Sequence, residues 1–351
     1  MSGRRIRVAV LYGGRSSEHE ISLAGGASVL GALDPARYEA VPVRIERDGG
    51  WQLEGATERL ALQPGVSGGG TLVPTSPGGL PAATEAGPID VVIPLLHGPF
   101  GEDGTVQGLL EMLDVPYVGS GVLGSALTMD KDVVKLVLRA AGIRVAEHLT
   151  FRDGTWDEGT IERTIGFPCF VKPARLGSSV GISKVHDRRE LEPALRLAFD
   201  HDSKVLVERF MSGREVEVGL LGNPPRVQVS VAGEIRIAND SEWYDFAAKY
   251  DEGGMELVAP AELPDATASE LRDAARRAFE VCECHGMARI DFFVTDAGEV
   301  VLNEINTIPG FTATSVYARL FEASGLAYSE LLDELVKLAL ERHADDRRYK
   351  H

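Results

Sequence analysis

Near its carboxy terminus the chain reads Arg289-Ile290-Asp291-Phe292-Phe293-Val294 and, after the turn Thr295-Asp296-Ala297-Gly298-Glu299, Val301-Leu302-Asn303-Glu304-Ile305-Asn306. Two apolar stretches around a short polar turn predict a β-hairpin. Since side chains alternate along a strand, Arg289 and Asp291 share one face, and Glu304 and Asn306 share a face of the partner. Facing each other, the strands would gather three hard oxygen ligands and one arginine, a set that suits Mg²⁺. A solvated hairpin face explains the pattern equally well.

Upstream, a second hairpin is predicted around a loop rich in glycine and serine. Its strands are residues 167–173 and 182–185, and the loop reads Lys172-Pro173-Ala174-Arg175-Leu176-Gly177-Ser178-Ser179-Val180-Gly181. Small side chains let backbone N–H groups approach a phosphate, and Lys172 can point at the same group. The loop lacks the spacing of a P-loop, so an ordinary turn is the competing interpretation. Residues 205–211 form a buried strand that fits either a nucleotide edge or plain packing.

The first third of the chain alternates strand-like and helical segments, which is typical of a parallel sheet with covering helices. Gly13-Gly14-Arg15-Ser16-Ser17-Glu18-His19-Glu20 follows the first strand, and His97-Gly98 ends another, at the edge where such sheets bind ligands. A tight connection and a structural histidine are the alternatives. Ser17 and Glu20 have the spacing of a capping box. The strands are expected at 6–12, 38–45 and 89–96, and the helices at 17–33 and 104–113.

Residues 48–88 are rich in glycine, proline, serine and threonine. We interpret them as an extended surface insertion around a short amphipathic piece at 56–62, and expect the most mobile region there.

Three domains are predicted. Gly119-Ser120-Gly121 precedes one long helix at 123–141 and marks the first boundary. A helix at 189–199 belongs to the second domain, and the last third is richer in strands, at 215–221, 226–231, 289–294 and 300–305, with helices at 266–284 and 329–342. The resulting division is α/β for 1–121, α+β for 122–211 and α+β for 212–351.

Composition narrows the class of function. A chain of 351 residues with 44% hydrophobic content can bury a large core and form clefts between domains, as enzymes do. The net charge of −17 and the absence of a basic run disfavour nucleic-acid binding. No stretch reaches the roughly 20 apolar residues that cross a bilayer. Three cysteines cannot all pair within the chain, so we expect a reduced, cytoplasmic compartment, and we interpret Cys282-x-Cys284-His285 as packing rather than a metal site.

Taken together, these segments resemble the D-alanine–D-alanine ligase family, in order over nearly the whole chain outside 48–88. The segment Gly13 to Ser22 is similar to that family's first signature, and His97-Gly98-Pro99-Phe100-Gly101-Glu102-Asp103-Gly104 to its second. Arg289-Ile290-Asp291, with Asn303-Glu304-Ile305-Asn306-Thr307-Ile308-Pro309-Gly310-Phe311-Thr312, is similar to its third.

The resemblance implies a three-domain ATP-grasp fold with an amino-terminal parallel-sheet domain, and ATP held between the central and carboxy-terminal domains. The implied reaction joins two D-alanines through a D-alanyl phosphate and releases ADP and phosphate, for peptidoglycan precursor synthesis. The implied protein is cytoplasmic and commonly a homodimer.

The resemblance also implies roles for the matching residues. Those near ATP are Lys131 and Lys172 at the phosphates, Ser179 and Lys249 close by, and Glu208 and Glu215 at the ribose or adenine end. Two Mg²⁺ ions, or Mn²⁺, would be held by Asp291, Glu304 and Asn306. The D-alanines would be bound by Glu18 at the first ammonium and by Ser315 with Lys249 at the second carboxylate.

Catalysis is implied for a further set. Ser178, Tyr250 and Glu18 would form a hydrogen-bonded set that links the phosphate loop to a closing loop at 243–250. Arg289 and the Gly310 N–H would stabilise the tetrahedral oxyanion. The base that deprotonates the second ammonium stays open among His97, Tyr250 and the phosphate. A related ligase that uses D-lactate or D-serine is the nearest rival, which the Lys249-Tyr250 pair disfavours, and a non-catalytic nucleotide-binding protein is the rival from another class.

Overall fold

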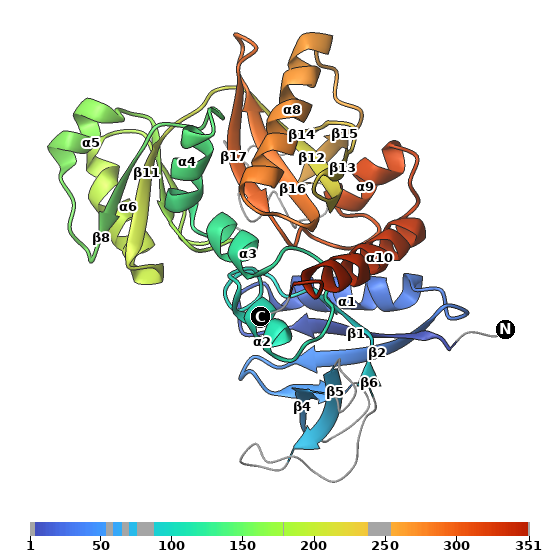
Figure 1. The fold of residues 1–351 in the computed structure, drawn as a ribbon. Coiled ribbons are helices and arrows are strands. Elements are labelled where there is room, and N and C mark those ends of the chain that lie inside the picture. The colour runs from blue at the N-terminus through green and yellow to red at the C-terminus, as the bar shows by residue number, and fades with distance from the viewer. Residues whose placement is uncertain are drawn as a thin grey trace.

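The computed structural model describes residues 4–53, 59–64, 70–75, 88–177, 179–237 and 254–349. The strands of these residues form three sheets, in the orders β6-β5-β4-β3-β2-β1-β7, β10-β9-β11-β8 and β15-β14-β12-β16-β17, with β13 paired to β12. In Figure 1 the second and third sheets lie side by side above the blue first sheet.

The first sheet is mixed rather than wholly parallel. Strand β1, next to the edge strand β7, pairs in parallel with β2 and β7, as the alternating pattern predicts. Residues 48–88, interpreted as an extended surface insertion, contain strands where the chain is described, and β3 to β6 extend the sheet in antiparallel pairs. The composition of this segment is typical of loops, but the neighbouring strands supply hydrogen-bond partners for its backbone N–H and C=O groups. The elements are β1 (Ile6–Gly13), α1 (His19–Ala32), β2 (Tyr38–Ile45), β3 (Trp51–Leu53), β4 (Arg59–Pro64), β5 (Gly70–Thr75), β6 (Pro88–Ile89), β7 (Val91–Pro94) and α2 (Thr105–Met112).

Two predicted helix features are wrong. The capping box at Ser17 and Glu20 does not form, because α1 begins at His19 with Glu18 as its N-cap and no side-chain cap bond. The long helix at 123–141 is two helices, α3 (Val122–Met129) and α4 (Lys131–Ala140). Asp130 between them is extended and accepts the Val133 N–H, so its side chain ends one helix and caps the next.

The second sheet contains the predicted glycine-rich hairpin. Strands β9 and β10 pair antiparallel, and β11 lies between β9 and β8. Its core is built from helices α5 and α6 against these strands. The elements are β8 (His148–Arg152), α5 (Glu158–Thr164), β9 (Cys169–Pro173), β10 (Ser183–Val185), α6 (Arg188–His201) and β11 (Lys204–Arg209).

The third sheet is antiparallel and holds the predicted hairpin of β16 and β17. Helix α8 covers it, together with Val134 and Leu138 of α4, in one buried cluster. The elements are β12 (Arg214–Asn223), β13 (Arg226–Val229), β14 (Gly233–Ile237), β15 (Met255–Val258), α8 (Asp265–Val281), β16 (Gly286–Val294), β17 (Val300–Asn306), α9 (Val316–Ala323) and α10 (Tyr328–Asp346).

The last helices tie the third sheet to the first. Side chains of α9 and α10, including Leu331, Leu335 and Phe321, share a core with Val8 and Val10 of β1. Figure 1 shows α10 lying along the junction of the upper and lower parts. Within the described residues, none of the helices combines the length and apolarity of a bilayer span. The domain boundaries at 121 and 211 stay a prediction.

Candidate active site

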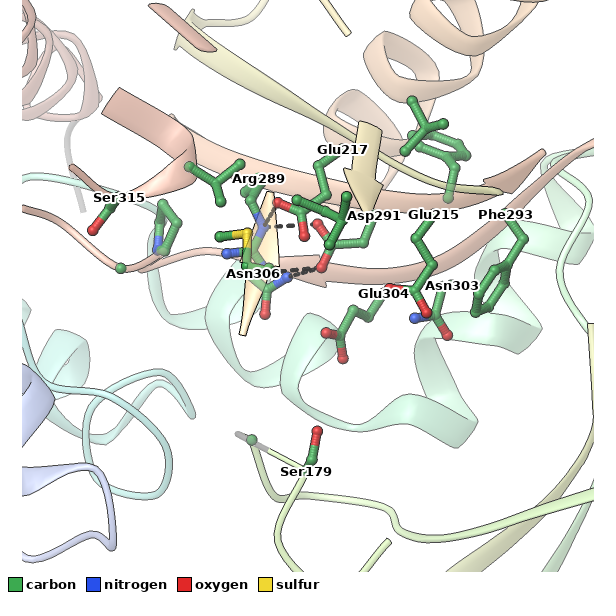
Figure 2. Close-up of a pocket in the computed structure, with 18 of the residues that line it drawn as sticks. Ser179, Glu215, Glu217, Arg289, Asp291, Phe293, Asn303, Glu304, Asn306 and Ser315 are labelled. Carbon is green, nitrogen blue, oxygen red and sulfur yellow. Dashed lines mark hydrogen bonds and ion pairs between the residues drawn. The ribbon is translucent and has the colours of Figure 1, made fainter. Parts of the chain in front are cut away.

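One cavity of about 760 Å³ is lined by residues from all three sheets and their loops. Glu18 and His97 come from loops of the first sheet, Lys172 and Ser179 from the second, and Arg289 with its neighbours from the third. Figure 2 shows the third-sheet side chains pointing down toward the loop that carries Ser179.

The strand pair β16–β17 places its polar residues as the sequence predicts. Arg289 lies opposite Asn306, and Asp291 opposite Glu304, before a bulge at Phe292. The Arg289 guanidinium donates two bonds of 2.8 Å to Asp291 and lies 2.9 Å from the Glu217 carboxylate. Arg289 is therefore fixed by two carboxylates, as the dashed contacts in Figure 2 show for this cluster.

The oxygen donors of this face fit a divalent cation. Asp291 Oδ2 accepts a hydrogen bond of 3.0 Å from the Asn306 amide N–H. The Asn306 amide oxygen can then serve as a metal ligand together with Glu304. Two carboxylates and an amide oxygen are hard ligands of the kind Mg²⁺ takes together with water and substrate phosphates. In the described part of the chain, no group of three or more His, Cys, Asp or Glu side chains is arranged to hold a metal alone.

Two lysines lie beside the facing loop, on the elements α4 and β9. Lys131, which α4 carries at its first position, donates through Nζ to the Leu176 carbonyl at 2.5 Å. Lys172 lies at the end of β9 and contacts the Glu208 carboxylate at 2.8 Å. Ser179 has a φ of 59°, in the left-handed region that such loops use to turn N–H groups toward one point.

Glu208 is buried beside the cavity, and its predicted role at the ribose or adenine stays a prediction. Its side chain is buried behind the cavity rather than in its lining, between Lys172 and a second lysine, Lys135, at 2.7 Å. Burial alone would raise the pKa of Glu208, but the two lysines outweigh it and hold the pKa at about 2. Its described contacts therefore orient Lys172, while Glu215 does line the cavity.

Glu18 lies where the first-sheet loops meet the phosphate loop. A Cβ on Gly98 would come within 3.0 Å of its Oε2, and a Cβ on Gly177 within 3.1 Å. Gly98 also has a φ of +70°, a conformation that favours glycine, and a Cβ there would displace the Glu18 carboxylate.

His97 is buried at the same place. Its Nδ1 lies 3.0 Å from the Ile308 carbonyl, which places the proton on Nδ1, and its Nε2 has no hydrogen-bond partner among the described residues. Burial lowers the pKa of His97, so the ring is neutral at pH 7.

Ser315 and Gly310 lie at the far end of the cavity, where α9 begins. Ser315 is the N-cap of that helix, and its Oγ accepts from the Thr312 N–H at 2.9 Å. A helix N-terminus favours an anion, as a substrate carboxylate requires. Figure 2 shows Ser315 apart from the Asp291–Glu304 cluster, on the side of Arg289.

Some predicted residues lie outside the described ranges, namely Ser178, Lys249 and Tyr250, together with the rest of 243–250. Sequence reasoning missed Glu217 and Lys135. Glu217 shares its strand face with Glu215, and that alternation was a usable signal. Lys135 stands one helical turn after Lys131, and only its burial in the structure marks it. Cys282 and Cys284 are free and buried in the core, which confirms the packing interpretation.

Comparison with known proteins agrees with this geometry. Residues 7–120 match the family described as D-ala D-ala ligase N-terminus, and residues 137–337 match D-ala D-ala ligase C-terminus. The chain belongs to the D-alanine–D-alanine ligase family. Two relatives named D-alanine–D-alanine ligase, from Mycobacterium sp. (strain JLS) and Geobacillus thermodenitrificans, are 48% and 44% identical, each over 97% of both chains.

Solved structures of this ligase family share the fold. The D-alanine–D-alanine ligase from Coxiella burnetii superposes with a TM-score of 0.86 at 34% identity, covering 99% of this chain and 97% of that one. The VanG D-Ala:D-Ser ligase from Enterococcus faecalis gives 0.82 at 33% identity, covering 96% and 100%. The expected ATP-grasp fold is confirmed.

Proposed function

We propose that the chain ligates two D-alanines to D-alanyl-D-alanine through a D-alanyl phosphate, with transfer of the γ-phosphoryl group of ATP and release of ADP and phosphate, for peptidoglycan precursor synthesis. One observation carries the proposal: a single cavity is lined by Lys131 and Lys172, by the carboxylates of Asp291 and Glu304, and by Glu18. Phosphate-binding cations, metal-binding oxygens and an ammonium-binding carboxylate are the three groups that this reaction needs.

A carboxylate resists attack by an amine, so it must first be activated. Phosphoryl transfer to the first D-alanine relies on positioning and on neutralising phosphate charge. Lys172, fixed by Glu208, and Lys131 provide cations at the phosphate loop. Asp291, Glu304 and Asn306 would hold Mg²⁺, two ions in this family's reaction with Mn²⁺ as a substitute, and the ion supplies further charge neutralisation.

In the second step an amine attacks the acyl carbon and an oxyanion develops. Arg289 is pre-oriented by Glu217 and Asp291, so it would meet that charge without reorganisation. Gly310 N–H would be the second donor, and Ser315 at the start of α9, with Lys249, would receive the second carboxylate. Neutral His97, with a lone pair on Nε2, is the base that its described geometry supports, and Tyr250 and the phosphate are the alternatives.

The acyl phosphate must be shielded from water while it waits for the amine. Glu18 faces Gly177 of the phosphate loop, which supports the proposed set of Glu18, Ser178 and Tyr250 at the closing loop 243–250.

The deciding experiment measures ADP release together with product mass, with ATP, Mg²⁺ and D-alanine. Equimolar ADP and D-alanyl-D-alanine are expected, and L-alanine should be inert. Because a D-Ala:D-Ser ligase shares the fold, mixtures of D-alanine with D-serine or D-lactate are run in parallel. A product formed only with a mixed acceptor would move the assignment to those ligases, and no ADP in any mixture would contradict it.

The setting of the reaction is also proposed. We place it in the cytoplasm, which three free, buried cysteines support. A homodimer built on the first domain is supported by exposed apolar side chains on α2, Met112 at 85% and Leu109 at 40%. Sedimentation at a single subunit mass would contradict the dimer. No nucleic-acid or membrane partner is proposed.

A further inference from the structure

The loop after β7 grips one peptide unit of the segment that follows β17. Glu102 accepts the Ile308 N–H at 3.3 Å, and the His97 ring lies 3.0 Å from the Ile308 carbonyl. Both polar backbone groups of Ile308 are therefore engaged by a loop more than 200 residues earlier in the sequence. The other Glu102 oxygen accepts the Gly98 N–H at 2.8 Å, which closes its own loop around the contact.

These two contacts hold residues 308–310, and the Gly310 N–H is the proposed second oxyanion donor in the attack of the amine on the acyl carbon. Ile308 is 2% exposed, and it is followed by Pro309, whose ring fixes φ, and then by Gly310. Because the link is short and stiff, a shift of Ile308 moves the Gly310 N–H with it. A displacement of about 1 Å at a reacting centre can cost a factor of about 10² in rate.

Packing alone does not explain why a carboxyl group occupies position 102. Burial raises the pKa of Glu102 to about 8, with the Glu18 and Glu304 charges adding to the effect and two backbone N–H groups opposing it. The ionised form of this carboxyl group therefore costs stability here, as a neutral side chain would not. Its two-oxygen geometry, with one acceptor for Gly98 and one for Ile308, is what a neutral amide cannot reproduce.

We propose that Glu102 is a positioning residue for peptide-bond formation, which holds the Gly310 N–H in place by clamping Ile308 together with His97. The inference rests on the proposed function and names a residue that acts on its second step. Acyl phosphate formation depends on the lysines and carboxylates across the cavity, so it should proceed without the clamp.

The test is Glu102→Gln, which keeps the size of the side chain but turns one acceptor into a donor facing an N–H group. ADP and dipeptide are measured together under saturating ATP and D-alanine. We expect dipeptide turnover to fall about 10- to 100-fold, while KM for ATP stays within about twofold. The ratio of ADP to dipeptide should rise above one, because the acyl phosphate forms and is then lost to water.

Asp103 supplies a matched control. It is the next residue and also accepts two backbone N–H groups, from Phe100 at 2.9 Å and Thr105 at 3.0 Å, but both donors lie within three residues of it in the sequence. Asp103→Asn should lower thermal stability without changing the ratio of ADP to dipeptide. An equal rise in both variants would assign the effect to loop structure and overturn the clamp.

The remaining outcomes separate the two levels of inference. A coupled, near-normal Glu102→Gln enzyme would overturn the clamp alone, whereas a wild-type enzyme that forms no dipeptide would overturn the proposed function. If Glu102→Gln does not fold, Glu102→Asp carries the same test. It keeps both acceptors on a shorter arm, so a ratio above one is expected, and a ratio of one would overturn the proposal.

Discussion

The Arg289 side chain is oriented in the folded protein before the proposed oxyanion develops. Its guanidinium already contacts Glu217 and Asp291, and it is held at the cavity rather than free to adapt. The cost of orienting a long cationic side chain is therefore met during folding instead of in the transition state.

Arg289→Met should lower kcat by about 10²–10³, the usual loss for one oxyanion donor. It should also destabilise the fold, because it leaves two partly buried carboxylates facing each other. Steady-state kinetics and thermal unfolding measure the two effects. Arg289→Lys is the control: it restores the positive charge, and thus much of the stability, but not the planar fork. A Met variant with kcat near wild type would remove Arg289 from the mechanism.

Glu102 gives a pH dependence of stability whose sign is fixed. Its pKa is raised in the folded chain, to about 8 from 4.5, so the folded state holds the proton more tightly than the unfolded state does. That contribution is complete below the unfolded pKa and is lost as pH rises toward 8. Between pH 5.5 and 8.5, wild type should therefore lose about 2–5 °C in Tm relative to Glu102→Gln. Parallel Tm profiles for the two proteins would contradict this.

At the scale of elements, the loop after β7 depends on one glycine. Gly98→Ala should cost about 1 kcal/mol in the left-handed region and should also push the new methyl group against Glu18. Gly154 has nearly the same φ, +69° against +70°, but nothing within 4 Å of its would-be Cβ. Gly154→Ala should therefore match the loss of stability and leave kinetics unchanged, while only Gly98→Ala raises KM for D-alanine, roughly tenfold. A normal KM in both variants would detach Gly98 from the Glu18 site.

Helix α4 connects the second and third sheets, because its Lys135 contacts β11 and β17. Lys135 Nζ bonds Glu208 and also, at 3.1 Å, the carbonyl of Asn303, which precedes the proposed metal ligand Glu304. Lys135→Met leaves a buried carboxylate with one lysine instead of two, so a loss of about 3–5 kcal/mol and a raised KM for ATP are expected.

Lys204 is the control for this helix, since it is equally buried but pairs with Asp130 and Asp132. Lys204→Met should destabilise the protein with less effect on KM for ATP. Equal changes in KM would show that Lys135 acts only through stability.

These elements also show what the sequence could predict. The β16–β17 hairpin and its facing pairs follow from alternation along two adjacent strands, which is local information. The strands within 48–88 were missed because their hydrogen-bond partners are supplied by the sheet and not by composition. Lys135 and the Glu102 contact to Ile308 were missed for the same reason, because each depends on a segment distant in sequence.

At the scale of the whole molecule, the hydrophobic cores do not follow the three sheets one by one. Side chains of β1, β7 and α1 share a core with α9 and α10, so the first and third sheets are joined. The second sheet has a core of its own, made only of residues between Leu149 and Val207. A ligand that binds in the cavity between the second and third sheets would therefore link two separately packed units.

This arrangement predicts two calorimetric transitions in the ligand-free protein, since each separately packed unit unfolds cooperatively. Leu195→Ala in the second-sheet core and Leu335→Ala in the shared core remove the same atoms from fully buried sites, and each should cost about 2–5 kcal/mol. Leu195→Ala should lower one transition and Leu335→Ala the other. ADP with Mg²⁺ is proposed to bind between the two units, so it should raise the transition that Leu195→Ala lowers and bring the two transitions closer in temperature. If either substitution shifted both transitions equally without ligand, the cores would form one cooperative unit, and closure of the cavity would not be a movement of the second sheet against the rest.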